Sequence, residues 1–121
     1  MTPSEIIAND PESKKAGPEK VLASIAKLTA SGDAILLRSK NTVLLVIKIA
    51  PETAELHLYS VDSPVAIGMA MKDFHDKLVK SDVKRVYGSA PAGSPIVRLM
   101  RMMGFEMMES DNPKYSWMGN V

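Results

Sequence analysis

Apolar residues in the first half of the chain recur once at helical spacing and then three times in strand-like segments. A helix is predicted from Pro18, which suits the first helical position, to about Gly32, which can end it. Its apolar face consists of Val21, Leu22, Ile25 and Leu28. Three strand-like segments follow at Ala34–Arg38, Val43–Ile49 and Ala54–Val61. Because short turns join them, these segments predict an antiparallel meander.

The second half of the chain alternates between helical and strand patterns. Ser63 can cap a helix that begins at Pro64, whose apolar positions repeat at helical spacing as far as Leu78. The elements predicted after it are a strand at 83–89, a turn at 91–95, a helix at 96–103, and strands at 105–109 and 115–118. A strand–helix–strand unit of this size predicts parallel pairing through a right-handed crossover. We therefore expect an α+β fold with a mixed sheet.

The first 17 residues are expected to form an extended arm outside a single domain that spans residues 18–121. Proline, glycine and polar residues dominate the arm, and only Ile6 and Ile7 are strongly apolar. Two interpretations remain open. The segment is either a frayed terminus or an arm that docks on a neighbouring subunit through these two isoleucines.

Composition limits the classes of function. The 121 residues suffice for one domain with a real core, and an apolar fraction of 45% is ordinary for a globular protein. A net charge of +1 gives no general attraction to nucleic acid or anionic membranes, so we expect neither as a partner. The lack of cysteine excludes disulfides and thiolate chemistry, and two histidines alone offer no metal-site spacing. No signal-peptide or membrane-spanning pattern occurs, so we expect a cytoplasmic location.

The order of predicted elements resembles the fold of the GNAT superfamily of N-acetyltransferases. The resemblance covers roughly residues 18–119 and lacks the first strand usual in that family. Two local features support it: the strand–turn–helix at Tyr59–Lys80, and the Gly104-Phe105 step before the penultimate strand. The resemblance implies a mixed sheet, acetyl-CoA as the cofactor, and acyl transfer to an amine.

The family's motif for the acetyl-CoA pyrophosphate is matched only in part. That motif is (Arg/Gln)-x-x-Gly-x-(Gly/Ala), and its register here runs from Val65 to Ala70. Gly68 and Ala70 fit as cofactor-binding residues, whereas Val65 replaces the polar side chain. Pro64 removes a backbone donor near the helix start. Met100 stands where many members carry the tyrosine that protonates the departing thiolate, and methionine cannot donate a proton.

Glu55 and His57 are the candidate catalytic pair. Residues at i and i+2 share one face of a strand, so both side chains point the same way. The resemblance implies that either could be the general base for an amine, with Tyr59 or water as proton donor. The alternative is a polar stripe that faces solvent on a half-exposed sheet.

Methionine is abundant near the end of the chain, and its positions do not share one face. Met102 should point away from Met100 on the helix, and Met107 and Met108 lie on opposite faces of their strand. Methionine and aromatic residues are common at protein interfaces, so we expect a contact surface. Its predicted members are Ile6, Ile7, Met102, Met107, Met108, Tyr115 and Trp117. The alternative is a loosely specified core.

Three functions are compatible with these patterns. The first, and the one that we expect, is a non-catalytic GNAT-like protein that needs no cofactor and binds protein partners or a second copy, because the acetyl-CoA motif and the tyrosine position are not matched. Its C-terminal half looks like small virion-associated proteins of bacteriophages, which would place it in the host cytoplasm or the virion. The second is an active, acetyl-CoA-dependent N-acyltransferase. The third is a small RNA-binding module built on Lys84, Arg85, Arg98 and Arg101.

Overall fold

The computed structural model describes residues 1–91 and 93–121, and it has the mixed α+β fold that the sequence predicts. The helices are α1 (Pro3–Asn9), α2 (Pro11–Ala16), α3 (Pro18–Ala30), α4 (Pro64–Val79) and α5 (Ile96–Met102). The strands are β1 (Ala34–Ser39), β2 (Thr42–Ala50), β3 (Thr53–Ser60), β4 (Arg85–Gly88), β5 (Glu106–Met108) and β6 (Trp117–Asn120). The turn predicted at 91–95 contains Ala92, which lies outside the described residues. No helix in the described part of the chain is long and apolar enough to cross a membrane.

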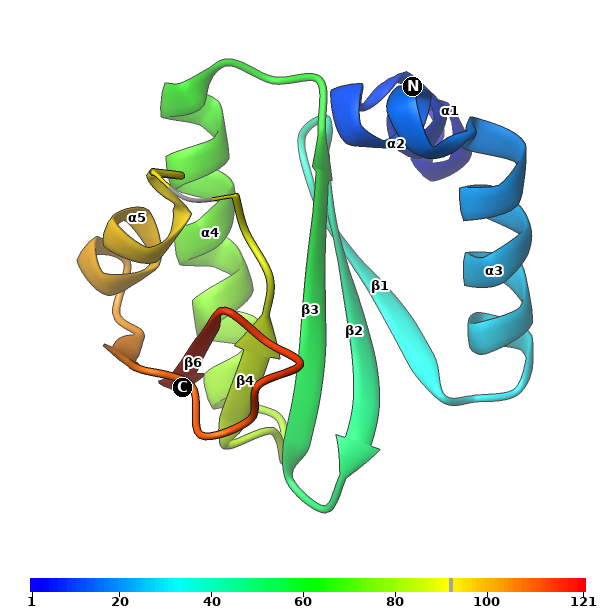
Figure 1. The fold of residues 1–121 in the computed structure, drawn as a ribbon. Helices are drawn as coiled ribbons and strands as arrows, with labels where there is room; N and C mark the ends of the chain where they lie inside the picture. Colours follow the sequence, from blue (N-terminus) through cyan, green and yellow to red (C-terminus); the bar gives the residue numbers. More distant parts are fainter. Residues whose placement is uncertain (92) are drawn as a thin grey trace.

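The sheet has the strand order β1-β2-β3-β4-β6-β5, and its two halves meet at a short parallel pairing. The meander β1-β2-β3 is antiparallel, as predicted, and so are the pairs β4–β6 and β5–β6. Strands β3 and β4 run parallel and pair from Thr53 with Arg85 to Glu55 with Tyr87. Helix α4 makes the crossover between them. Beyond this pairing, the chain that follows β4 leaves β3 (Figure 1).

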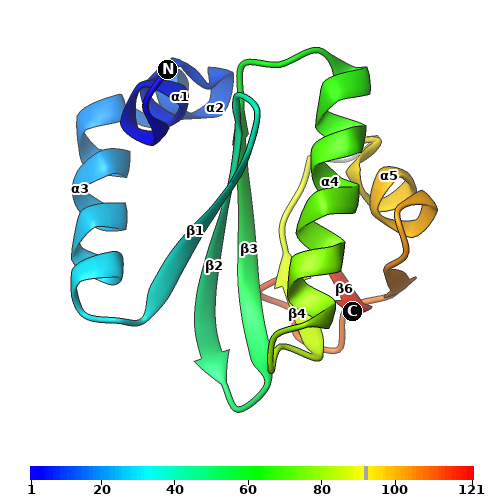
Figure 2. The same cartoon turned by 180° about the vertical axis from the view of Figure 1, so that it is seen from behind.

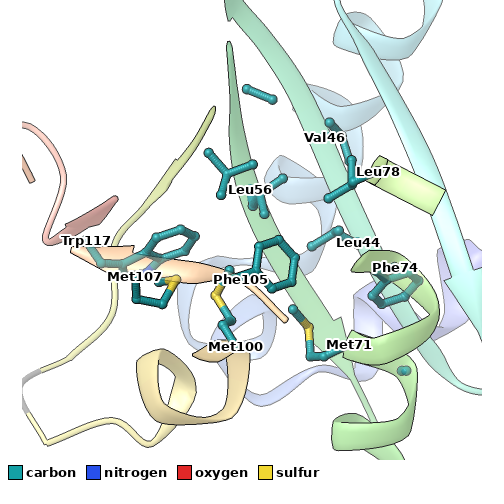
Figure 3. Packing of buried hydrophobic residues seen from close by; sticks show 13 residues of the cluster. Leu44, Val46, Leu56, Met71, Phe74, Leu78, Met100, Phe105, Met107 and Trp117 are labelled. Atoms are coloured by element: carbon teal, nitrogen blue, oxygen red, sulfur yellow. The ribbon is translucent and has the colours of Figure 1, made fainter. Parts of the chain in front are cut away.

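The main core lies between the sheet and helices α4 and α5, which cover one face (Figure 2). Side chains from both helices meet strand residues there, including Phe74, Met71, Met100, Phe105 and Trp117 (Figure 3). Fully burying one such side chain stabilises the fold by about 1.5–3 kcal/mol. This core fixes the helices relative to the point where β3 and β4 separate.

The expectation of an extended N-terminal arm is wrong, because most of the first 17 residues are helical. Helices α1 and α2 pack with α3 on the other face of the sheet (Figure 1). Ile6 and Ile7 are fully buried there, against Ile25 of α3 and the meander. Each short helix begins with proline directly after a capping side chain, Thr2 for α1 and Asp10 for α2. These cap-proline steps are a helix-start signal that apolar periodicity cannot show in segments of six or seven residues.

The predicted contact surface is mostly interior, which corrects that prediction. Its buried members are Ile6, Ile7, Met107, Tyr115 and Trp117. The Trp117 ring fills the space where a side chain at Gly88 would lie, so it closes the core instead of facing a partner. Met108 is half-buried, and Met102 on α5 is exposed.

Candidate functional site

An apolar cleft of about 800 Å³ opens where β3 and β4 separate. One wall is β3, the opposite wall is the chain that follows β4, and helices close the cleft from both faces of the sheet. The lining includes Leu56, His57, Leu58 and Tyr59 of β3; Ser89, Ala90 and Pro91; Ile67, Met71, Leu99 and Met100 of α4 and α5; Glu12, Ser13 and Ala16 of α2; and Trp117. The cleft therefore runs through the sheet, with α2 at one end and α4 at the other.

The edge of β3 presents backbone groups to this cleft that have no partner among the described residues. The Val61 N–H donates to the carbonyl of Asn41, which directly precedes β2. The Ser60 N–H points away from β2 and donates to Asp10 Oδ1 at 2.9 Å. Backbone direction alternates along a strand, so the even-numbered residues of β3 face away from β2. Pairing with β4 ends at Glu55. The Leu56 C=O and both backbone groups of Leu58 therefore point into the gap.

Glu55 lies at the centre of a hydrogen-bonded chain that ends at the cleft. His57 Nε2 lies 2.6 Å from Glu55 Oε2, and the Tyr115 hydroxyl donates to Glu55 Oε1 at 2.5 Å. The Glu55 side chain is 15% exposed and that of His57 is 45% exposed. The two strand residues thus share a face, as predicted. His57 lines the cleft, and Glu55 lies behind it and is hydrogen-bonded to the His57 ring.

These contacts change the acidity of both partners of the Tyr115–Glu55 bond. Burial raises the pKa of the Glu55 carboxyl, but hydrogen bonds from Tyr115 and His57 outweigh it, and the pKa lies below its ordinary value. The hydrogen bond to Glu55 raises the pKa of Tyr115 to about 12. Glu55 is therefore a carboxylate near neutral pH, and the Tyr115 hydroxyl stays protonated and donates its hydrogen bond to it.

Tyr59, the predicted proton donor, lines the cleft further along β3. Burial is the main cause that raises the pKa of its phenol, and the negative charges of Asp10 and Glu55 add to it. Because a raised pKa makes the phenol a weaker acid, this placement is a poor one for proton donation.

Gly68 and Ala70, the predicted cofactor-binding residues, lie inside α4 and not in a loop before it. Both are buried, and a side chain at Gly68 would lie 3.3 Å from Leu99 of α5. The glycine therefore lets α5 approach α4, and neither residue can contact a phosphate. We correct the cofactor assignment accordingly: the motif match reflects helix packing.

The start of α4 offers few free donors. Ser63 Oγ accepts the Ala66 N–H at 3.3 Å, and the Ser63 carbonyl accepts the Ile67 N–H at 2.9 Å. Pro64 has no N–H, which leaves the Ser63 and Val65 N–H groups, of the first four positions, without a partner among the described residues. The side chains of Val61, Val65 and Met69 are apolar and exposed.

Two buried polar atoms of the cleft lining have no partner among the described residues. They are Ser13 Oγ on α2 and Trp117 Nε1 on β6, whose residues are 1% and 6% exposed. Buried polar groups are normally paired, so both mark places where a bound molecule or water would form a hydrogen bond. No group of three or more His, Asp or Glu side chains in residues 1–91 and 93–121 could hold a metal.

Sequence reasoning missed Tyr115 and Ser13 as parts of this site. The sequence pattern predicts Tyr115 on the final strand, but that strand begins at Trp117, and the preceding loop brings the phenol to Glu55. No local signal joins residues 60 positions apart. Ser13 follows the Asp10-Pro11 helix start, which would have predicted α2 but not its position over the cleft.

Comparisons with known proteins support the fold. No family model matches the chain, and no curated protein matches it in sequence. Among solved structures, PaiA N-acetyltransferase from Thermoplasma acidophilum, in complex with coenzyme A, is 14% identical, with 98% of this chain and 90% of that chain covered and a TM-score of 0.59. An acetyltransferase from Bacillus subtilis, also with coenzyme A, is 10% identical, with 96% and 86% covered and a TM-score of 0.56. A ribosomal-protein-alanine N-acetyltransferase from Brucella melitensis is 12% identical, with 86% and 77% covered and a TM-score of 0.55. The chain has a GNAT-like fold.

Proposed function

We propose that this protein transfers an acyl group from a thioester of the coenzyme A type to an amine. The observation that carries the proposal is the hydrogen-bonded Glu55–His57 pair, whose imidazole lines the cleft beside the free edge of β3. The similar structures are acetyltransferases, two of them with coenzyme A bound, which supports the same class of reaction. A bound thioester supplies an activated acyl carbon, and the protein must hold the reactants and move one proton.

His57 is suited to take the proton of the amine because its neutral tautomer is fixed. An ionised carboxylate only accepts hydrogen bonds, so Glu55 holds the N–H of His57 at Nε2. The lone pair of neutral His57 is then on Nδ1. When Nδ1 takes the amine proton, the ring becomes an imidazolium, and the adjacent carboxylate stabilises this charge.

The same proton can then leave with the sulfur. As the new carbon–nitrogen bond forms, the carbon–sulfur bond breaks and the electron pair stays on sulfur. Met100 cannot donate a proton, and burial weakens Tyr59 as an acid. His57 Nδ1 therefore returns the proton that it took from the amine. The reaction yields an amide and a thiol with no further acid consumed.

Thiol release in the presence of primary amines tests this proposal. The chain has no cysteine, so a thiol-reactive dye reports the product without background from the protein. We expect His57→Gln to lower kcat/KM by about 10²- to 10⁴-fold, the usual contribution of a general base. Tyr59→Phe, on the same strand and in the same cleft, is the matched control and should stay within about threefold of wild type. Equal rates for wild type and H57Q would refute the role of His57.

A non-catalytic interaction protein is the second proposal, and the exposed Met102 favours it, together with Val65 and Met69 on α4. No rise in melting temperature with acetyl-CoA, together with no thiol release, would support this function over acyl transfer. An RNA-binding module has less support, because Arg85 already contacts Asn120 and Asp111.

A further inference from the structure

We propose that the cleft recognises its thioester through the pantetheine arm alone, without contacts to the nucleotide diphosphate. An acyl-pantetheine would then serve as well as an acyl-CoA. This inference rests on the proposed function, because it names the substrate class of the same cleft. It is carried by the uncharged hydrogen-bonding groups inside the cleft and by the apolar start of α4 at its mouth.

The inside of the cleft matches an extended chain of amides. The Leu56 C=O and the N–H and C=O of Leu58 point into the gap left by β4. An extended ligand can pair with such an edge as an added strand does. Ser13 Oγ and Trp117 Nε1 are buried in the same lining without partners among the described residues. A neutral ligand with amide and hydroxyl groups would satisfy these atoms, and an anion is not needed.

The mouth of the cleft, by contrast, lacks the features that hold a diphosphate. Pro64 lines the cleft at the start of α4, where backbone donors would be required. Its missing N–H and the bond from Ala66 to Ser63 Oγ leave the N–H groups of Ser63 and Val65 as the donors of that turn without a partner among the described residues.

The side chains around this turn do not replace the missing donors. Residues 60–69 contain no Lys or Arg, and their charged member is Asp62, an anion. Val65 and Met69 are 76% and 56% exposed, so the outer surface beside the mouth is apolar. A diphosphate here would meet two backbone donors and no cation from this segment, which gives it little binding energy.

Calorimetric titration of the full chain with acetyl-CoA and with acetyl-pantetheine tests the inference. We expect dissociation constants within about threefold of each other, with little change between roughly 50 and 300 mM NaCl. Val65→Arg places a cation at the exposed first turn. It should tighten acetyl-CoA binding about two- to fivefold, the range of an exposed ion pair, and leave acetyl-pantetheine unchanged.

The outcomes of these titrations separate the inference about pantetheine from the proposed function. If wild type binds acetyl-CoA more than about tenfold tighter than acetyl-pantetheine, the inference is overturned and the proposed function stands. If neither compound binds, both are overturned. Ser13→Ala should weaken both compounds equally, by about two- to tenfold. Unchanged constants for both compounds in S13A would remove Ser13 from the binding groups.

Discussion

Replacing Tyr115 by Phe removes one hydroxyl and leaves the ring in place. The hydroxyl donates to Glu55 Oε1 at 2.5 Å, and the ring lies 5.2 Å from that of Tyr87. The substitution therefore isolates the hydrogen bond from the aromatic packing. The substitution removes no atom of the Glu55–His57 contact, so the measured change reports the loss of the bond from Tyr115 to Glu55.

The burial of Glu55 sets the size of the effect. Its side chain is 15% exposed, and a hydrogen bond to a charged group in such a place contributes about 1.5–3 kcal/mol. We expect Y115F to lower the free energy of unfolding near neutral pH by about this amount. For a domain of this length, the melting temperature would fall by roughly 5–15 °C.

The loss should depend on pH, because the bonded form of Glu55 is the carboxylate. Although burial alone raises the pKa of Glu55, hydrogen bonds hold it below its ordinary 4.5 in the folded protein. A lowered folded pKa gives stability that is present above pH 4.5 and is lost as the pH falls through the folded value. The difference between wild type and Y115F should therefore shrink below pH 4.5. At the alkaline end, the raised pKa of Tyr115 gives stability that is present below pH 10 and lost towards pH 12.

Urea unfolding near pH 7 and near pH 3.5 measures both quantities. Tyr87→Phe is the matched control, because the Tyr87 hydroxyl donates to Asp111 Oδ1 at 2.8 Å and the Asp111 side chain is 60% exposed. That loss should stay below about 1 kcal/mol near pH 7. Equal losses in the two variants, or a Y115F loss that ignores pH, would refute the reasoning about Glu55.

Two further predictions concern stability. Asp10→Ala removes the cap of α2 and also the partner of a buried backbone N–H, so we expect the free energy of urea unfolding to fall by about 2–4 kcal/mol. Ser63→Ala removes only a cap and should lower it by about 1 kcal/mol. Equal losses would mean that the bond from Asp10 to β3 adds nothing to stability. Gly88→Ala would place a Cβ 2.1 Å from the Trp117 ring and should cost more than about 2 kcal/mol with a changed tryptophan fluorescence spectrum, whereas Gly68→Ala meets its nearest side-chain atom at 3.3 Å and should cost less than about 1 kcal/mol. A well-folded G88A with an unchanged spectrum would contradict the packing described for Trp117.

The fold from Pro18 onward could be predicted because its longer elements carry clear periodic patterns. The three meander strands and α4 repeat their apolar residues over enough positions to distinguish strand from helix. The N-terminal helices are too short for such a pattern, and caps at Thr2 and Asp10 fix them instead. The burial of Trp117 could not be predicted either, because it depends on the space above Gly88, which lies on another strand.

The candidate site was predictable only where one element supplies it. Glu55 and His57 share a strand face by simple alternation, and the structure brings them together. Tyr115 reaches Glu55 from a loop after β5, and α2 reaches the cleft from the other end of the chain. The motif match at Gly68 led to a wrong prediction of a cofactor-binding residue, because small residues are used for helix packing as well as for phosphate binding.

Asp10 also bears on how molecules can enter the cleft. One of its oxygens caps α2 and the other accepts the Ser60 N–H at the end of β3, so α2 and its cap cannot move away from the cleft without breaking the bond to β3. An opening that moves α1 together with α2 would also expose Ile6 and Ile7 of α1, at about 1.5–3 kcal/mol each. Since about 1.4 kcal/mol is a tenfold change in population, the open form would be below roughly 1%. We therefore expect molecules to enter the cleft through the gap between β3 and the chain that follows β4, while the N-terminal helices stay in place as one wall.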